Sequence, residues 1–443
     1  MPLPPSPLLP WALQALSLNV SDQAVLQPLA GDASQRRYFR LQVPAHSSSE
    51  HSAVGHSSPG LSNPELSPPE LSHPAGSWIV VDSPPATQKN KEFLAIRQWL
   101  ETGGVRVPGL LATDMGKGYM LLEDLGDQLL LERLRASCAA GVECIGNGSD
   151  ASHRSNSSHR SNSSNDSHRS NSSSGSNGSD ASHRSDASHR SNSSNGSNGS
   201  DVSHRSSGQA KDCYAQALDL QCRIAAIPRA AAFLPAYDNT LLAEELARFP
   251  QWFVTELLGL TLTADERALL AELDGLLIGS ALAQPCVLVH RDFHSRNLMC
   301  LADGKLAVID FQDAVFGPVT YDPVSLLKDC YIRWPREQVL AWALAHRDTL
   351  CSAGILPAVD DATYLRWFDW MGLQRHLKVL GTFARLALRD GKAHYLQDLP
   401  LVLDYVHEVL ALYASEDAAI AAVRSWFETR VQPAIRRQPW HVA

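Results

Sequence analysis

The chain has 443 residues, of which 44% are hydrophobic and 19% charged, and its net charge is −9 at pH 7. This length supports one large core or two lobes, and the acidic balance excludes a general electrostatic attraction to nucleic acid. No apolar run reaches the ~18 residues of a membrane helix, and residues 1–18 are broken by prolines and lack the basic start of a secretory signal. We therefore expect partners other than nucleic acid or a membrane.

The eight cysteines are scattered, without a C-x-x-C pair or a metal-ligand spacing. In a chain of this length the pattern is typical of reduced thiols, and it predicts a cytoplasmic location. We expect a monomer.

Taken in chain order, the first predicted elements are strands. Residues 34–43 (SQRRYFRLQV) alternate in character, and residues 77–84 (SWIVVDSP) form a β-branched run that ends at prolines. Residues 89–104 have apolar residues at helical spacing and end in a Gly pair, which predicts a capped amphipathic helix. Residues 110–126 predict two strands around a turn that contains Gly.

Two low-complexity segments interrupt this pattern. Residues 45–76 repeat LSNPE, LSPPE and LSHPA, and residues 146–208 repeat SHRSNSS and SDASHRS. Both have too few apolar residues to offset the entropy of ordering by burial, so we predict two disordered insertions. The six His-Arg pairs of the second segment suggest metal binding, but expansion of a solvated repeat is the simpler interpretation.

The rest of the chain predicts helices from Ala210 onward, interrupted by strands at residues 287–290 and 305–310. Between and after these strands lie three polar residues: Asp292, Asn297 and Asp310. Phosphoryl transfer needs one carboxylate that orients the acceptor hydroxyl and takes its proton, and two hard oxygen ligands for magnesium. We therefore predict Asp292 as the catalytic base and Asn297 and Asp310 as the metal ligands. Each residue alone is also typical of a turn or a strand end, but the combined spacing favours the site.

The motif HRDFHSRN resembles the catalytic loop H-x-D-x-x-x-x-N of the aminoglycoside phosphotransferase family, and IDFQD is similar to its counterpart of the kinase D-F-G. The resemblance implies an α+β, protein-kinase-like two-lobe fold, with a small β-rich N-lobe and a larger, mainly helical C-lobe. It also implies that His290 and Asp322 support the loop and take no part in the chemistry.

A narrower resemblance extends over most of the chain outside the insertions. GDASQRRYFRL, LLEDLG, VHRDFHSRNLM and LQRHLKVLGTFARLALRDGK resemble the bacterial anomeric sugar kinases of cell-wall recycling. These kinases phosphorylate N-acetylmuramate and N-acetylglucosamine at C1, so the resemblance implies ATP (or GTP), Mg²⁺, an amino-sugar acceptor and peptidoglycan recycling. Two alternatives stay open: a kinase for another small alcohol or an aminoglycoside, and a pseudokinase that only binds nucleotide.

Nucleotide contacts are predicted in the first lobe. Small residues at a turn let backbone N–H groups approach phosphate oxygens, and backbone groups after an apolar strand resemble the hinge that holds the base. The predicted residues are Gly31, Asp32, Ala33 and Ser34 at the turn, and Glu123 and Leu125 at the hinge. An ordinary turn is the alternative for each.

One departure from the superfamily concerns its strand lysine, which contacts the α- and β-phosphates. The corresponding strand reads WIVVDSPP, with Asp82 and no lysine. Arg36, Arg37 or Arg40 on the neighbouring strand is a possible replacement, although these arginines also fit a solvated face. The missing lysine is the motive for the pseudokinase alternative.

The acceptor is expected in the second lobe. Arg375 and Lys378 lie on a segment with helical spacing, and either cation suits the lactyl carboxylate of a muramic acid. Aromatic faces stack on sugar rings, although core packing is the usual role of such residues. The other members of this segment are Trp367, Trp370, Gln374 and His376.

The predicted domain organisation follows from these assignments. It comprises an N-terminal nucleotide-binding lobe at 1–125, the start of the C-lobe at 126–145, the insertion at 146–208, and a catalytic and substrate-binding lobe at 209–443.

Overall fold

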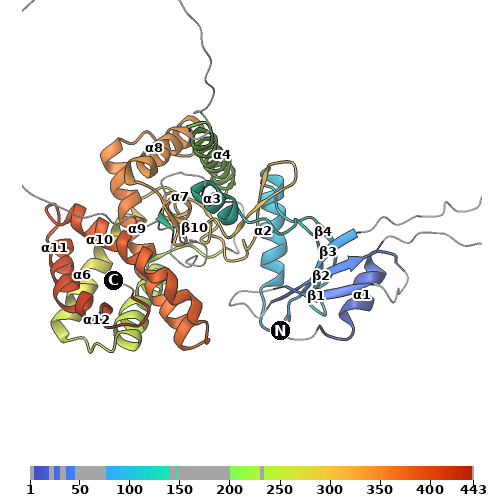
Figure 1. Cartoon of the computed structure of the whole chain (residues 1–443), viewed down its shortest axis with the longest axis horizontal. Coiled ribbons are helices and arrows are strands. Elements are labelled where there is room, and N and C mark those ends of the chain that lie inside the picture. Colours follow the sequence, from blue (N-terminus) through green and yellow to red (C-terminus); the bar gives the residue numbers. More distant parts are fainter. Residues whose placement is uncertain are drawn as a thin grey trace, which may run out of the picture.

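The computed structural model describes residues 4–18, 24–29, 36–44, 76–139, 145–146, 200–229 and 234–441. Within these residues the chain forms two lobes that lie side by side in Figure 1, a small one built on a sheet and a larger helical one. The predicted turn at residues 31–34 and nearly all of both predicted insertions lie outside the described residues. Helix α4 begins at Ser200, inside the span assigned to the second insertion.

The small lobe contains an antiparallel sheet with the strand order β1-β2-β3-β5-β4. Its elements are α1 (Leu8–Ala15), β1 (Val25–Pro28), β2 (Arg37–Val43), β3 (Gly76–Asp82), α2 (Asn90–Thr102), β4 (Leu110–Asp114) and β5 (Tyr119–Glu123). The predictions of β2, β3, α2, β4 and β5 are confirmed. Helix α1 and strand β1 were not predicted.

The sheet has a helix on each face. Successive side chains of a strand point to opposite faces, so Val80 packs in a core with Leu8 of α1. Val81 instead belongs to the main core, which includes Phe93 and Ile96 of α2. Helix α2 lies between the sheet and the larger lobe (Figure 1), and its buried apolar residues belong to the main core, which extends into the larger lobe.

Helix α2 ends at the predicted Gly pair. Gly104 adopts the left-handed conformation, with φ of 74°, and the N–H of Val105 donates to the carbonyl of Leu100 at 2.8 Å. A glycine at this position satisfies the last helical carbonyls at no steric cost, which explains why the pattern was readable from sequence.

The larger lobe is mainly helical, and its described residues also form three short two-stranded antiparallel sheets. Its elements are α3 (Leu130–Ala139), β6 (Ile145–Gly146), α4 (Ser200–Ala225), α5 (Asn239–Leu246), η1 (Phe249–Leu257), α6 (Ala264–Leu282), β7 (Cys286–Val289), β8 (Leu298–Cys300), β9 (Leu306–Val308), β10 (Val315–Pro318), α7 (Tyr321–Leu327), β11 (Ile332–Arg333), α8 (Arg336–Ser352), α9 (Asp361–Leu388), η2 (Ala393–Asp398), α10 (Leu399–Tyr413), α11 (Ala418–Trp426), η3 (Phe427–Val431) and α12 (Gln432–Ile435). Strands β7 and β9 were predicted, whereas β10, which pairs with β7, was not.

Helix α9 is the central element of this lobe and packs against η1, α6, α7, α8 and α10. A Cβ atom at Gly381 would lie 2.3 Å from the backbone of Arg248. Only glycine therefore permits α9 to approach the start of η1 this closely.

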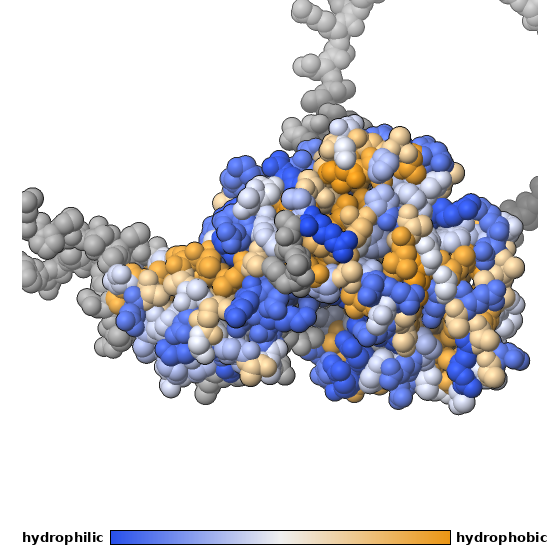
Figure 2. Space-filling model, turned by 180° about the vertical axis from the view of Figure 1, so that it is seen from behind, coloured by the Kyte–Doolittle hydropathy of each residue, from blue (hydrophilic) through white to orange (hydrophobic). Residues whose placement is uncertain are grey.

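The surface on the face shown in Figure 2 mixes hydrophilic and hydrophobic residues over both lobes. Among the described residues, no helix is long and apolar enough to cross a membrane. Six described cysteines are free thiols, as expected, but Cys138 is disulfide-bonded, so the expectation of reduced thiols is wrong at that position.

Candidate active site

The loop after β7 is held by a buried carboxylate. The side chain of Asp322, in α7, accepts the N–H of His290 at 2.8 Å and the N–H of Arg291 at 3.0 Å. Arg291 has a φ of 74°, a left-handed conformation that costs energy for any residue other than glycine. Burial raises the pKa of Asp322 to about 6, against the lowering effect of His290 and the two backbone N–H groups. The two hydrogen bonds hold the strained backbone in place, which agrees with the supporting role expected for Asp322.

His290 connects the loop to the strand that delivers Asp310. Its Nδ1 accepts the N–H of Asp292 at 3.3 Å, and its Nε2 lies 3.0 Å from the carbonyl of Ile309. These two contacts require the proton on Nε2. The N–H of Ile309 in turn donates to the carbonyl of Asn297 at 3.0 Å, so one imidazole fixes the two ends of the site relative to each other.

A second carboxylate holds the middle of the loop. Asp329, just beyond α7, accepts the N–H of Ser295 at 3.0 Å and the N–H of Tyr331 at 3.2 Å. The carbonyl of Ser295 accepts the N–H of Leu131 of α3 at 3.1 Å. Asp329 was not identified from the sequence, because nothing local relates it to a serine 34 residues away.

The two predicted metal ligands lie at the end of this network. The amide nitrogen of Asn297 donates to the carbonyl of Asp292 at 2.9 Å, which leaves the amide oxygen as the ligand atom for a cation. Asp310 has a φ of 62° and accepts a hydrogen bond from the side chain of Gln312 at 2.7 Å. Asn297 and Asp310 line the same cavity, so the structure brings together residues that the sequence placed on separate elements.

This arrangement fits Mg²⁺ better than a tightly held structural metal. Within the described ranges there is no group of three or more His, Cys, Asp or Glu side chains that could hold a metal ion. Mg²⁺ commonly takes one or two protein oxygens and completes its shell with water and substrate phosphates. Asn297 and Asp310 supply such a partial set.

Asp292 lies in a positive field. Burial disfavours its ionised form, but Lys378 and Arg291, together with His294 and Arg375, outweigh this and hold the pKa of Asp292 well below its usual range. The carboxylate is therefore ionised at neutral pH, as a group that orients a hydroxyl and accepts its proton must be.

A buried acid balances these cations. Glu245 of α5 is fully buried, and its carboxylate lies 3.1 Å from the ammonium of Lys378 and pairs with the guanidinium of Arg291. It also accepts a hydrogen bond from the hydroxyl of Tyr237. Lys378 donates to the hydroxyl of Tyr321 at 2.8 Å. We call these five residues the Glu245 cluster.

A cavity of about 570 Å³ opens between the lobes, a volume in the range of small-molecule sites. Its lining residues come from the sheet, the segment after β5, the catalytic loop and the connection after α9: Leu29, Tyr38, Arg40, Ile79, Phe93, Pro108, Leu122, Glu123, Asp124, Leu125, Gly126, Asp127, Leu129, Arg296, Asn297, Met299, Ile309, Asp310, Phe311, Lys392 and His394. Asp292 is not among them. The predicted hinge residues Glu123 and Leu125 therefore do lie at a cavity that also contains both predicted metal ligands.

The hinge is held by ion pairs with side chains of the small lobe. Glu123 pairs with Arg106 at 2.5 Å and accepts the N–H of Gly109 at 3.0 Å. Arg40 of β2 lies 2.7 Å from Asp124 and 2.7 Å from Asp127. The side chain of Glu123 is thus occupied, and so is its backbone N–H, which donates to the carbonyl of Gly109 at 2.8 Å.

The three arginines considered as replacements for the missing lysine have different environments. Arg37 pairs with Asp82 of β3, and Arg40 is engaged at the hinge. Arg36 is buried, donates to the hydroxyl of Ser83 at 3.0 Å and lies 4.7 Å from the ring centroid of Phe93. Arg36 is not among the residues that line the cavity, but Phe93 is, and Phe93 stacks on Phe311, the residue after Asp310.

The predicted acceptor residues of α9 lie mostly in the interior. Arg375 is buried and donates to the thiol of Cys330 at 3.2 Å, and Lys378 belongs to the Glu245 cluster. The side chains of Gln374 and His376 are also buried, and Trp367 and Trp370 are half-buried. The helical spacing was predicted correctly, but it does not reveal which face of a helix is covered by others.

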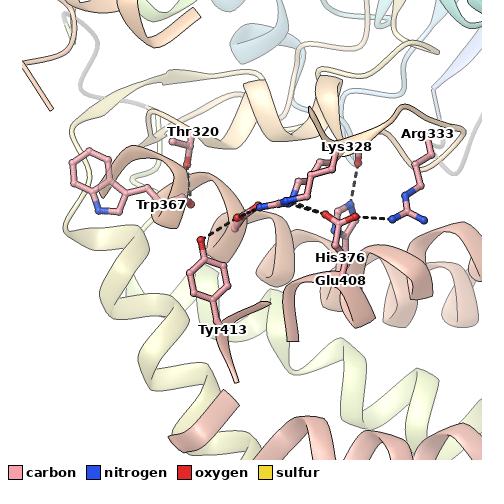
Figure 3. A network of polar contacts seen from close by, with 9 residues as sticks. Thr320, Lys328, Arg333, Trp367, His376, Glu408 and Tyr413 are labelled. Atoms are coloured by element: carbon pink, nitrogen blue, oxygen red, sulfur yellow. Dashed lines mark hydrogen bonds and ion pairs between the residues drawn. The ribbon is translucent and has the colours of Figure 1, made fainter. Parts of the chain in front are cut away.

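Helix α9 also contributes residues to a buried charge network beside α7 (Figure 3). The ammonium of Lys328 lies 2.6 Å from Asp369, which also receives hydrogen bonds from Arg336 at 2.7 Å and from Tyr413 at 3.0 Å. The ring of His376 contacts the carbonyl of Lys328 at 2.9 Å. This network fixes the segment that carries Asp322 and Asp329, so α9 supports the catalytic loop indirectly.

The family model described as "Phosphotransferase enzyme family" matches residues 195–360. The N-acetylmuramate/N-acetylglucosamine kinase of Pseudomonas putida is 32% identical over 87% of this chain and 83% of its own length. The kinase of the same name from Pseudomonas aeruginosa is 32% identical over 88% of this chain and 84% of its own length.

The chain belongs to the family of these N-acetylmuramate/N-acetylglucosamine kinases. A third member, from Neisseria meningitidis, is 47% identical over 41% of this chain and 54% of its own length. The resemblance predicted from the catalytic motif and the flanking segments is confirmed.

Similar solved structures include the ADP-bound aminoglycoside phosphotransferase APH(2'')-Ib, with a TM-score of 0.47 and 11% identity over 91% of this chain and 98% of that one. The gentamicin complex of APH(2'')-IIa has a TM-score of 0.49 and 10% identity over 91% of this chain and 97% of that one. The predicted α+β fold, with a β-rich small lobe and a helical larger lobe, is confirmed.

Proposed function

We propose that this chain transfers the γ-phosphate of ATP to the anomeric hydroxyl of N-acetylmuramate or N-acetylglucosamine, with Mg²⁺ at the phosphates. The observation that carries the proposal is the catalytic loop: an ionised Asp292, joined through Asn297 to the cavity that contains Asp310. The acceptor class comes from the names of the relatives that cover most of the chain. The cytoplasmic location, the monomeric state and the lobe boundaries stay predictions.

Each residue of the site has a separate role in this reaction. Asp292 orients the acceptor hydroxyl and accepts its proton, which its positive surroundings permit because they keep it unprotonated beforehand. The oxygens of Asn297 and Asp310 hold the cation, which when bound neutralises phosphate charge. The backbone after Glu123, including Leu125, accommodates the base, and the phosphate contacts predicted at residues 31–34 lie outside the described residues.

Arg36 supplies the positive charge that the missing strand lysine supplies elsewhere in the superfamily. Its guanidinium is held by Ser83 and by the ring of Phe93, which lines the cavity. A guanidinium binds phosphate with several donors at once. This assignment removes the main motive for the pseudokinase alternative.

The test is release of ADP from Mg²⁺-ATP with a panel of acceptors: N-acetylmuramate, N-acetylglucosamine, choline and kanamycin. We expect acceptor-dependent ADP release with the two amino sugars, none without Mg²⁺, and none with the variant Asp292→Asn. Turnover of kanamycin alone would overturn the acceptor assignment but leave the kinase assignment intact. Nucleotide binding without turnover of any acceptor would favour the pseudokinase.

A further inference from the structure

Three basic side chains gather on one side of the cavity. Arg296 precedes the predicted metal ligand Asn297, Lys392 lies in the connection between α9 and η2, and His394 lies at the start of η2. Lys392 is half-buried and His394 is exposed. All three belong to the larger lobe, opposite the hinge and the sheet.

The backbone of this connection is fixed. The N–H of Lys392 donates to the carbonyl of Leu386 at 3.0 Å, and the N–H of Tyr395 donates to the carbonyl of Lys392 at 3.2 Å. The ring of His394 lies against that of Tyr395, with centroids 4.4 Å apart. Lys392 therefore extends from an anchored segment and not from a free loop.

Aromatic packing positions Arg296 on the same side. Its guanidinium lies 4.8 Å from the ring centroid of Tyr331. Tyr331 stacks on Phe383, and Phe383 in turn lies against Tyr395. A continuous set of rings thus supports Arg296 at one end and the Lys392 connection at the other.

The charges around the cavity are unevenly balanced. On the hinge side, Glu123 pairs with Arg106, and Asp124 and Asp127 pair with Arg40. On the opposite side, the nearby carboxylate of Asp390 pairs with Arg389, and within the part of the chain that the structure describes no carboxylate forms an ion pair with Lys392. Lys392 therefore offers its positive charge to an anion that enters from outside, in a cavity whose lining also includes the carboxylate of Asp310.

The cations expected to serve this purpose have other roles. Arg375 is buried against Cys330, and Lys378 is bound to Glu245 and Tyr321. N-acetylmuramate differs from N-acetylglucosamine by a lactyl ether that ends in a carboxylate, so an additional cation distinguishes the two sugars. We propose that Lys392, with Arg296 beside it, binds this acceptor carboxylate. The inference rests on the proposed function and assigns the selectivity between its two substrates.

The experiment compares the steady-state kinetics of the parent chain and Lys392→Met on both sugars at saturating Mg²⁺-ATP. We expect the KM for N-acetylmuramate to rise about 10-fold, the typical effect of losing a charge-assisted hydrogen bond. The KM for N-acetylglucosamine should change less than about two-fold, since that sugar has no carboxylate to lose. Lys392→Arg should restore most of the N-acetylmuramate affinity, and raising ionic strength should weaken the parent's affinity for N-acetylmuramate more than that of Lys392→Met.

The matched control is Lys305→Met. Lys305 lies on the β8–β9 turn, its side chain is 78% exposed and pairs with Asp303, and it does not line the cavity. It should leave both sugars unaffected. Equal changes in KM for both sugars, a changed KM for ATP, or no change with either sugar would each overturn the assignment of Lys392. Failure of the parent chain to phosphorylate either sugar would instead overturn the proposed function.

Discussion

Replacement of Glu245 with Gln tests whether the Glu245 cluster holds the catalytic loop in place. Glu245 is 0% exposed and compensates the charges of Arg291 and Lys378. The substitution preserves size and an acceptor for Tyr237, but it leaves two largely buried cations without their counter-charge. Removing one partner of a buried pair typically costs about 3–5 kcal/mol. Since Asp292 still compensates Lys378 in part, we expect a loss of about 3 kcal/mol in the free energy of unfolding.

The assay is urea unfolding followed by tryptophan fluorescence. The control is Glu244→Gln, the neighbouring residue of α5, which is exposed and should change the free energy of unfolding by less than about 0.5 kcal/mol. The double variant Glu245→Gln/Lys378→Met should recover part of the loss, because it removes one of the unpaired cations. A loss below about 1 kcal/mol for Glu245→Gln, which is near the average for any substitution, would refute the interpretation of the cluster.

Three further predictions concern chemistry, nucleotide binding and pH. Asp292→Asn should lower turnover by a factor of about 10²–10⁴ and retain nucleotide affinity. Asp310→Asn should also weaken Mg²⁺-dependent nucleotide binding in a fluorescent-nucleotide titration. Turnover of Asp292→Asn close to that of the parent would exclude Asp292 as the base. Arg36→Met should raise the KM for ATP about 10-fold or more, and an unchanged KM would exclude Arg36 as the phosphate cation. Burial lowers the pKa of His346 from 6.5 to about 4, so its contribution to stability is fully present above pH 6.5 and is lost as the pH falls toward 4, by up to about 3 kcal/mol. His346→Gln should therefore show a smaller difference in melting temperature between pH 7.5 and pH 5 than the parent. An equal difference would contradict the claim that His346 contributes to the loss of stability at low pH.

The residues proposed to carry the chemistry could be identified together because they are local in sequence. Asp292 and Asn297 lie five residues apart after an apolar strand, and the return strand delivers Asp310 within the same segment. The hairpin that joins them is short, so its strands and its polar ends appear together in one pattern. The same holds for α2, where apolar spacing and a Gly pair mark both the covered face and the end.

The residues that hold the loop were not predictable, because their partners are distant along the chain. Glu245 reaches Arg291 across 46 residues, and Ser295 meets Asp329 across 34. A lone acid in a helix is typical of a solvated face, and only the packing of α5 against the loop reverses that interpretation. On α9 the sequence did not reveal burial: Arg375 and Lys378, predicted as candidates for the acceptor carboxylate, are both buried.

Element α1 and strands β1 and β10 were missed for a related reason. Strand β1 has four residues and α1 has eight, too few for a periodic pattern to distinguish them from a connecting segment. Strand β10 contains a glycine and a proline, residues that usually argue against a strand, but it pairs with β7 at the edge of a two-stranded sheet.

The central claim is transfer of phosphate to the anomeric hydroxyl of an amino sugar, and the most direct measurement is the position of the phosphate in the product. The purified chain is incubated with Mg²⁺-ATP and either N-acetylmuramate or N-acetylglucosamine, and the product is examined by phosphorus-coupled proton NMR. The account predicts a phosphate coupled to the anomeric proton, at C1, for at least one sugar and its loss with Asp292→Asn. A phosphate at any other carbon, or no phosphorylated sugar beside an active phosphorylation of kanamycin, would contradict it.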